Sequence, residues 1–427
     1  MQTLNVPNVE AGATRLGGPG GILSEEQVRA FITEQLAATD LDGHSVCVII
    51  PDATRSCPLP LLWSAVHAAL YRRVSRLTVL VALGTHAAMT EQALAVHLGY
   101  RTGTLATTYP GTTLLNHEFW NPSAFAYVGT IPAARLAQLS GGLLRQQVQV
   151  LLNRAVVEHD VTLIVGPVFP HEVAGFSGGN KYLFPGVSGQ DVIDVSHWLG
   201  ALITSAEIIG KRGVTPVRAL INEAVSLVPG RRLAFCLVAA AGGHSLHAAS
   251  FGEPHAAWAS AAEVSAQTHV EYLDAPVHRV LSLIPTKYPD MWTGAKGFYK
   301  VEPVVADGGQ VVLYAPHIRD VSLMHPRITD IGYHCRDYFV KQWDRFQDVH
   351  WGDLAHSTHL RGAGSYDSVT GERCRVTVTL ATGIPEQVVR AINLDYFDPA
   401  DVDLDALTGD PNTLVVHQAG EVLFRLR

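Results

Sequence analysis

The sequence predicts an α/β fold of two α/β domains with mostly parallel sheets and an active site in the cleft between them. Its 427 residues are enough for more than one core, because domains usually hold about 100–200 residues. Short apolar runs alternate with helical patterns, which is typical of βαβ units and parallel sheets. Polar residues follow several of these runs, at the strand ends where such sheets bind ligands.

Four apolar runs in the first 240 residues predict strands at 45–50, 77–83, 161–165 and 233–239. The run at 161–165 is too short for a helix and too uniformly apolar for a half-solvated strand, so we expect a buried one. Helices are predicted at 24–39, 60–71, 91–98, 188–202 and 215–227. Ser188 and Asp191 form a capping-box pattern, and Thr215 before Pro216 is a second helix start.

A second α/β segment begins near residue 274, with strands predicted at 277–284, 310–314 and 375–380 and helices at 290–301 and 336–345. We therefore expect an N-terminal domain at 1–272 and a C-terminal domain at 273–411. Residues 412–427 predict a hairpin around 418–420, and these strands are candidates to return to the first domain.

Composition and charge exclude several classes of protein. The chain is 47% hydrophobic and 16% charged, as in a well-buried globular protein. Its net charge is −8 and its 31 Lys and Arg residues are scattered, so we expect no nucleic-acid partner. No apolar stretch approaches the roughly 20 residues that span a bilayer, and the N-terminus lacks signal-peptide features. We expect a cytoplasmic protein without membrane contact. Five dispersed cysteines argue against a disulfide framework and a thiolate zinc site.

Three predicted strand ends carry polar groups that the fold alone does not require. The first strand leads into 51–58, the second into Gly84-Thr-His86, and the third into His171 and Lys181. Taken alone, Asp52 or Thr54 is best interpreted as a loop residue that satisfies a helix end. Three strand ends together predict a site, because parallel strands end at one edge of a sheet.

His86 and His171 are the candidates for proton transfer, because an imidazole titrates near neutral pH. Two imidazoles on opposite faces of a carbon atom would permit racemisation. Lys181 follows glycines that let backbone N–H groups approach an anion. Its amine is either a point charge for a phosphate or a covalent nucleophile. The loop does not fit a P-loop, because Tyr182 stands where Ser or Thr would hold magnesium.

His197 lies on the helix predicted at 188–202, and Asp194 precedes it by three residues, on the same face. A carboxylate that orients an imidazole is common behind a metal-bound histidine. The pair is equally consistent with a structural hydrogen bond. Glu172 is a further candidate metal ligand.

The motifs Asp52-Ala-Thr-Arg55, Leu83-Gly-Thr-His86 and 170–181 resemble the lactate racemase family, the nickel-pincer nucleotide-dependent racemases and epimerases of 2-hydroxy acids. The resemblance covers essentially the full length. It implies Ni(II)-pyridinium-3,5-bisthiocarboxylate mononucleotide as cofactor, covalently attached to Lys181, with His197 as the nickel ligand. It also implies dependence on cofactor-synthesis proteins.

Further roles follow from the same resemblance. The mononucleotide loop would be Asp52, Ala53, Thr54 and Arg55, and the acid/base pair would be His86 and His171. One histidine would take the hydroxyl proton while hydride leaves C2, and return of hydride to the other face would invert the centre. Substrate-binding residues would be Arg55, Trp292, Thr293 and Lys296, with Lys300 as a competitor.

Two departures from the lactate enzymes concern the substrate and the cofactor loop. Ser56 follows Arg55 where we expect proline, and Trp292-Thr293 replace an expected Tyr and Gln. A 2-hydroxy acid other than lactate is therefore a candidate substrate. Two alternatives remain: a hydrolase with zinc held by His86, His117, His171 and His197, and a non-catalytic nucleotide- or metal-binding protein.

Overall fold

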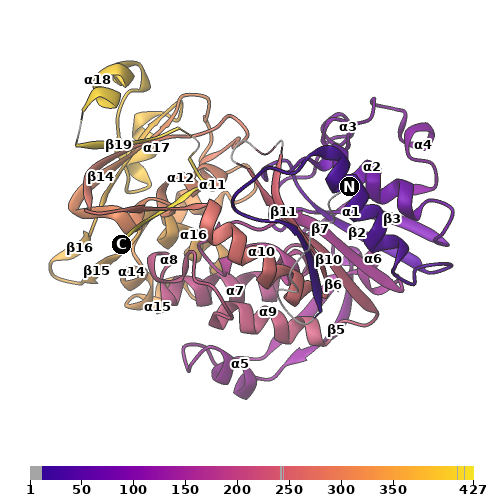
Figure 1. Ribbon diagram of the computed structural model, residues 1–427. Helices are drawn as coiled ribbons and strands as arrows, with labels where there is room; N and C mark the ends of the chain where they lie inside the picture. The colour runs from indigo at the N-terminus through magenta and orange to yellow at the C-terminus, as the bar shows by residue number, and fades with distance from the viewer. Residues whose placement is uncertain (1–11, 241–242, 244, 411, 418) are drawn as a thin grey trace.

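The computed structural model (Figure 1) describes residues 12–240, 243, 245–410, 412–417 and 419–427. Its largest sheet has seven strands in the order β1-β11-β10-β7-β2-β3-β4. From β10 to β4 neighbouring strands run parallel, while β11 and β1 pair antiparallel at one edge. The strands are β1 (Ala13–Gly17), β2 (Ser45–Pro51), β3 (Arg76–Ala82), β4 (Thr112–Asn116), β7 (Val161–Pro167), β10 (Arg231–Ala239) and β11 (Leu246–Gly252). All four strands predicted in this segment are confirmed.

Helices cover both faces of this sheet, which explains why its strands are continuously apolar. Alternate residues of β2 enter different cores: Val46 and Val48 pack with α1 and α2, whereas Cys47 and Ile49 pack with α7, α9 and α10. The helices are α1 (Glu25–Ala37), α2 (Leu59–Leu70), α3 (Glu91–Leu98), α4 (Leu105–Thr108), α5 (Ala133–Leu139), α6 (Arg154–Val157), α7 (Gln190–Ile203), α8 (Ser205–Ile208), α9 (Pro216–Ser226) and α10 (Pro254–Thr268). The sequence patterns did not predict α10.

One of the two predicted helix starts is confirmed. Thr215 caps α9 and accepts a hydrogen bond from the Arg218 N–H at 3.1 Å. The capping box at Ser188 is wrong, because α7 begins after Gly189 without a side-chain cap. The Ser188 hydroxyl donates to the Pro185 carbonyl instead, at 3.4 Å.

The second large sheet has five parallel strands in the order β18-β17-β14-β13-β19. The strands are β13 (Val277–Leu283), β14 (Val305–Ala315), β17 (Thr377–Thr382), β18 (Asp395–Tyr396) and β19 (Thr413–Val416). The three strands predicted in this segment are confirmed as β13, β14 and β17. Val311 and Leu313 of β14 belong to the same apolar cluster as Ile49 of β2, so the packing is continuous across the molecule.

The predicted helices of this segment are shorter than expected. Residues 290–301 form α11 (Met291–Gly294) and α12 (Lys296–Tyr299), and 336–345 form α14 (Arg336–Val340) and α15 (Trp343–Phe346). Gly297 allows close packing in α12, since a Cβ atom there would lie 2.3 Å from Ile284 Cδ1. The other helices are α13 (Arg327–Ile331), α16 (Trp351–Arg361), α17 (Glu386–Ala391) and α18 (Leu404–Gly409).

Small elements complete the fold. They are the antiparallel pairs β5 (Phe125–Ile131) with β6 (Val148–Asn153), β8 (Pro170–His171) with β9 (Gly175–Phe176) and β15 (Gly364–Asp367) with β16 (Gly371–Cys374), and the 3-10 turns η1 (Pro122–Ala124), η2 (Gly179–Tyr182), η3 (Glu302–Val304) and η4 (Pro399–Asp401).

The C-terminal hairpin is wrong, because its two strands find partners elsewhere. β19 pairs parallel with β13, and β20 (Leu423–Leu426) pairs parallel with β12 (Val270–Leu273). Residue 418 of the expected turn lies outside the described residues. The final strand therefore lies beside β12, which spans the proposed boundary at 272, and that boundary stays a prediction.

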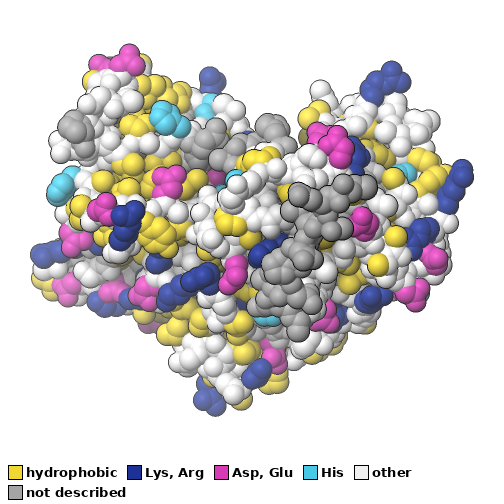
Figure 2. Space-filling model, viewed as in Figure 1, with side chains coloured by type: hydrophobic (Ala, Val, Ile, Leu, Met, Phe, Trp, Pro, Cys, Tyr) yellow, Lys and Arg dark blue, Asp and Glu magenta, His cyan; other side chains and the backbone are white. Residues whose placement is uncertain are grey.

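The face of the molecule in Figure 2 shows no basic patch. In Figure 2 the basic and acidic side chains are interspersed over the visible face, which is hollowed between two lobes. Among the described helices, none combines the length and apolarity needed to cross a bilayer.

Candidate functional site

A cavity of about 140 Å³ collects residues that follow β2, β3 and β7 together with residues of α7, α11, α12 and α16. Of the predicted site residues, it is lined by Asp52, Arg55, His86, His171, Lys181, His197, Trp292 and Lys296. The convergence of strand ends at one site is therefore confirmed. Ala53, Thr54 and Thr293 do not line this cavity, although Thr54 lines a smaller one behind Arg55.

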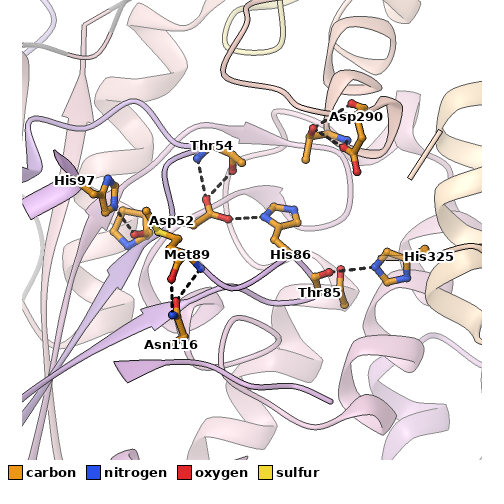
Figure 3. A network of polar contacts seen from close by, with 11 residues as sticks. Asp52, Thr54, Thr85, His86, Met89, His97, Asn116, Asp290 and His325 are labelled. Atoms are coloured by element: carbon orange, nitrogen blue, oxygen red, sulfur yellow. Dashed lines mark hydrogen bonds and ion pairs between the residues drawn. The ribbon is translucent and has the colours of Figure 1, made fainter. Parts of the chain in front are cut away.

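Asp52 and His86 form a hydrogen-bonded pair at the ends of β2 and β3 (Figure 3). One Asp52 oxygen contacts His86 Nδ1, and the other accepts bonds from the Thr54 N–H at 3.1 Å and hydroxyl at 2.6 Å. Burial opposes ionisation of Asp52, but His86 and then Arg55 hold the pKa of its carboxyl well below its usual range. An ionised Asp52 accepts a hydrogen bond from His86 Nδ1–H, and Nε2 of the neutral ring then keeps its lone pair.

His171 lies on β8, buried, with two different groups at its Nδ1 atom. The Val173 N–H donates to Nδ1 at 3.1 Å, and Glu172 Oε2 lies 3.3 Å from the same atom. The first contact favours the ring with its proton on Nε2, and the second favours the proton on Nδ1. Burial, and then the charges of Lys181 and Arg55, lowers the pKa of His171 well below its ordinary value. The neutral ring therefore has support for either tautomer.

The glycine loop before Lys181 is fixed by close packing. A Cβ atom on Gly178 would lie 2.5 Å from Val168 Cγ2, and one on Gly179 would lie 2.7 Å from Trp258 Cβ. Both glycines have positive φ, which other residues rarely adopt. Buried Arg218 donates to the carbonyls of Gly178, at 3.1 Å, and of Phe176, and its guanidinium lies 4.0 Å from the Trp258 ring centroid.

Lys181 is set in an environment that favours its neutral amine. Burial, and then the charge of Arg55, lowers the pKa of Lys181 to about 7. Lysine amines ordinarily titrate near pH 10.4. A neutral amine is nucleophilic at physiological pH, so the setting of Lys181 suits a covalent tether better than a permanent point charge.

This environment predicts an unusual pH dependence of labelling at Lys181. Because only the neutral amine reacts, acylation of Lys181 should rise with pH through about 7 and level off above it. We expect this profile in competitive labelling with acetic anhydride, followed by peptide mass spectrometry. Acylation of a lysine in a reference peptide should rise near pH 10. A midpoint for Lys181 above pH 9 would show that the amine is charged in the folded protein.

His197 lines the cavity, but Asp194 does not orient its imidazole ring. His197 Nδ1 donates to the Ile193 carbonyl at 2.7 Å, which leaves Nε2 available as a metal ligand. Burial, and then Lys181, lowers the pKa of His197 to about 4. Asp194 instead accepts bonds from Gly352 N–H at 2.8 Å and Gln190 Nε2 at 3.0 Å. The backbone carbonyl one turn earlier takes the role predicted for Asp194.

The two lysines of the second segment have different surroundings. Lys296 lines the main cavity, its ammonium lies 4.8 Å from the Tyr288 ring centroid, and burial followed by Arg55 lowers its pKa to about 7. Lys300 donates to the carbonyls of Pro170 at 2.7 Å and Glu421 at 3.0 Å. The Lys300 ammonium is thus used in bonds to the backbone, and Lys296 is the better placed of the two to contact a ligand.

Trp292 forms one wall of the cavity in a stack of rings. Its ring centroid lies 3.8 Å from the centroids of His325 and His356. The interplanar angles are 11° with His325 and 25° with His356. His325 Nε2 lies 3.2 Å from the Thr85 carbonyl, beside His86 (Figure 3). Thr293 lies next in the chain, but its hydroxyl is 2.7 Å from Asp290 Oδ1 at the start of α11.

Sequence reasoning missed Tyr299, His356 and His359, which also line the cavity. The two histidines stand three residues apart on α16, a spacing that was visible in the sequence. Among 20 histidines this spacing was a weak signal, and no strand end precedes it.

The four-histidine zinc site is wrong. His117 is buried away from the main cavity, where it contacts Asn153 Nδ2 at 3.1 Å and the Ser188 carbonyl at 3.3 Å. Within the described part of the chain, no group of three or more His, Cys, Asp or Glu side chains is arranged to hold a metal. His197 and Lys181 line the same cavity, so an organic group attached to the lysine could supply the remaining ligands of a metal held by His197.

Comparisons with known proteins show similarity to lactate racemases. Residues 25–209 match the lactate racemase N-terminal domain. Curated lactate racemases of Thermoanaerobacterium thermosaccharolyticum and Lactiplantibacillus plantarum are 27% and 26% identical over 157 and 160 residues, which is 36% of this chain and 32% of each relative. The matched segments thus span about a third of the curated relatives.

Solved structures extend the likeness to almost the whole chain. A Thermotoga maritima protein of known crystal structure is 31% identical, with a TM-score of 0.87, over 96% of this chain and 100% of that one. The lactate racemase apoprotein of Thermoanaerobacterium thermosaccharolyticum shares the fold, with a TM-score of 0.69 and 19% identity over 95% of each chain. Residues 25–209 of this chain are thus similar to the N-terminal domain of lactate racemases.

Proposed function

We propose that the protein is an isomerase that racemises or epimerises a 2-hydroxy acid. One observation carries this proposal: two imidazoles line one cavity, and each has a carboxylate at its Nδ1 atom, Asp52 for His86 and Glu172 for His171. A racemase needs a proton acceptor for each enantiomer, and a carboxylate behind an imidazole stabilises the protonated ring. The similarity to lactate racemases supports the same class of reaction.

The chain offers suitable residues for the nickel-pincer nucleotide. Lys181 would be the tether and His197 Nε2 the nickel ligand, with Asp52, Ala53, Thr54 and Arg55 as the mononucleotide loop. Among these, Ala53 is exposed and Thr54 is bonded to Asp52, so their part is to shape the loop. When bound, the group would accept and return the C2 hydrogen as hydride. Its supply would make proteins of cofactor synthesis necessary partners.

The protein's own residues would bind the substrate and handle its protons. Arg55 lines the cavity as a cation suited to a carboxylate, and Lys296, which also lines it, would donate hydrogen bonds to the same group. His86 Nε2 would take the hydroxyl proton of one enantiomer, with Asp52 holding the resulting imidazolium. His171 would serve the other enantiomer in the tautomer whose Nδ1–H faces Glu172. Trp292, fixed between two imidazoles, would limit the substituent at C2, so the substrate need not be lactate.

The test is interconversion of enantiomers. Protein produced with the cofactor-synthesis proteins is incubated with each pure enantiomer of a panel of 2-hydroxy acids, and the products are separated by chiral chromatography. We expect at least one acid to reach an equal mixture from both sides. Protein that carries nickel and the nucleotide but leaves every acid unchanged would contradict the substrate class.

The remaining alternative is a protein that binds the nucleotide or metal without turnover. It predicts that His86→Ala and His171→Ala bind ligand like the parent and that the parent shows no interconversion. The zinc-hydrolase alternative loses its support, since His117 is not at the site.

A further inference from the structure

A second, smaller cavity lies directly behind Arg55 and His171. The two cavities share the lining residues Arg55, His171, Glu172, Ser177 and Lys296, and the turn at Gly420 and Glu421 also lines the smaller one. Gly420 has a φ of +96°, and a Cβ atom there would lie 2.9 Å from the Tyr288 hydroxyl. The C-terminal turn is therefore packed tightly against the rear of the candidate site.

The Glu421 carboxylate joins residues from both halves of the chain. It is 4% exposed, and its Oε1 atom accepts bonds from the Ser56 hydroxyl and from the Lys287 ammonium. The same ammonium donates to Ser56 Oγ at 2.7 Å. Ser56 follows Arg55 directly, so this three-residue cluster fixes the backbone from which Arg55 extends.

The Glu421 backbone reaches the other side of the site. Lys300 donates to the Glu421 carbonyl at 3.0 Å and to the Pro170 carbonyl at 2.7 Å. Pro170 precedes His171 on β8. One residue of the C-terminal turn is thus linked through Ser56 to Arg55 and through Lys300 to His171.

Ser56 is the residue that departs from the proline expected after the arginine. A proline has no hydroxyl to donate to Glu421, so this cluster depends on the serine. Gly243 leaves room for it, since a Cβ atom there would lie 2.4 Å from Ser56 Cβ. Serine in place of proline at position 56 therefore provides the hydroxyl that binds the buried Glu421 carboxylate.

We propose that Glu421 is a positioning residue that, through Ser56 and Lys287, holds Arg55 in the orientation that binds the substrate carboxylate. The assignment of Arg55 to a carboxylate rests on the proposed function. The orientation of Arg55 itself does not, and it can be measured separately.

The first measurement uses steady-state kinetics of the cofactor-loaded protein. Glu421→Gln, Ser56→Ala and Lys287→Met should each raise KM about tenfold while kcat falls less than threefold, because the substrate anchor is loosened and the proton-transfer groups remain. The double variant Ser56→Ala/Glu421→Gln should raise KM little more than either single change does. Ser56→Thr, which keeps the hydroxyl, should retain the parent KM. Glu386→Gln, which breaks the exposed pair with Arg390, is the matched control.

The second measurement needs no activity. Phenylglyoxal modification of Arg55, mapped by peptide mass spectrometry, should be faster in Glu421→Gln than in the parent or Glu386→Gln. If Arg55 is labelled faster in Glu421→Gln but neither the parent nor the variants racemise any substrate, the positioning role is upheld and the proposed function is contradicted. Normal KM and normal Arg55 labelling in an active Glu421→Gln protein would overturn the positioning role. If Glu421→Gln does not fold, Ser56→Ala and Lys287→Met decide by the same two readouts.

Discussion

Replacing either His86 or His171 with alanine should slow enantiomer interconversion by about 10²–10⁴-fold. The cost is large because each imidazole would be the proton acceptor on its side of C2, and alanine removes the ring that its carboxylate partner contacts. Racemisation measured by chiral chromatography checks this. The KM values should change far less than kcat, since the carboxylate-binding residues Arg55 and Lys296 remain.

A single-turnover experiment separates the two histidines. With cofactor-loaded protein in excess, each pure enantiomer should give trapped 2-oxo acid in the parent. His86→Ala should lose this product from one enantiomer and keep it from the other, and His171→Ala should do the reverse. Equal losses from both enantiomers in both variants would argue that the histidines shape the site without serving as paired bases.

Replacing Arg218 with methionine should lower the free energy of unfolding by about 3 kcal/mol. The change removes the Arg218 donor of the buried Phe176 carbonyl and one of two donors of the Gly178 carbonyl, which keeps the Lys181 N–H at 3.2 Å. An unsatisfied buried group costs about 1–3 kcal/mol. It also removes the guanidinium from the Trp258 ring. Part of the loss is offset, because burial already disfavours this charge and lowers the pKa of Arg218 to about 9. Urea unfolding measures the difference.

The matched control for Arg218 is Arg390→Met on the exposed face of α17, which should change the free energy of unfolding by less than about 0.5 kcal/mol. Arg218→Lys keeps the charge but cannot bond both carbonyls in the same geometry, so it should rescue only part of the loss. A stability of Arg218→Met within 0.5 kcal/mol of the parent would show that the glycine loop does not depend on this clamp.

The strand ends of the site were predictable because the underlying rule is topological. Parallel strands such as β2, β3 and β7 end at one sheet edge, so Asp52, His86 and His171 had to converge once the strands were recognised. The reactive state of Lys181 was not predictable from its neighbours in sequence, because it depends on burial and on Arg55 from another strand end.

Predictions were wrong where the side chains or strands of a local pattern find other hydrogen-bond partners in the folded structure. Asp194 and His197 share a helix face, yet a backbone carbonyl lies closer to the imidazole, and a backbone N–H of α16 takes the carboxylate. The strands of 412–427 do not pair with each other, since β13 and β12 offer better-placed edges. The link from Glu421 to Ser56 spans most of the chain, and no sequence pattern marks it.

We propose that a tethered nickel-bearing nucleotide binds in the cavity lined by Lys181 and His197. Intact and peptide mass spectrometry, with nickel analysis, on protein produced with the cofactor-synthesis proteins tests it most directly. We predict one nucleotide-sized adduct mapped to Lys181 with about one nickel per chain, no adduct in Lys181→Ala, and an adduct that loses most of its nickel in His197→Ala. An adduct on another residue, or full nickel retention in Lys181→Ala, would contradict the account.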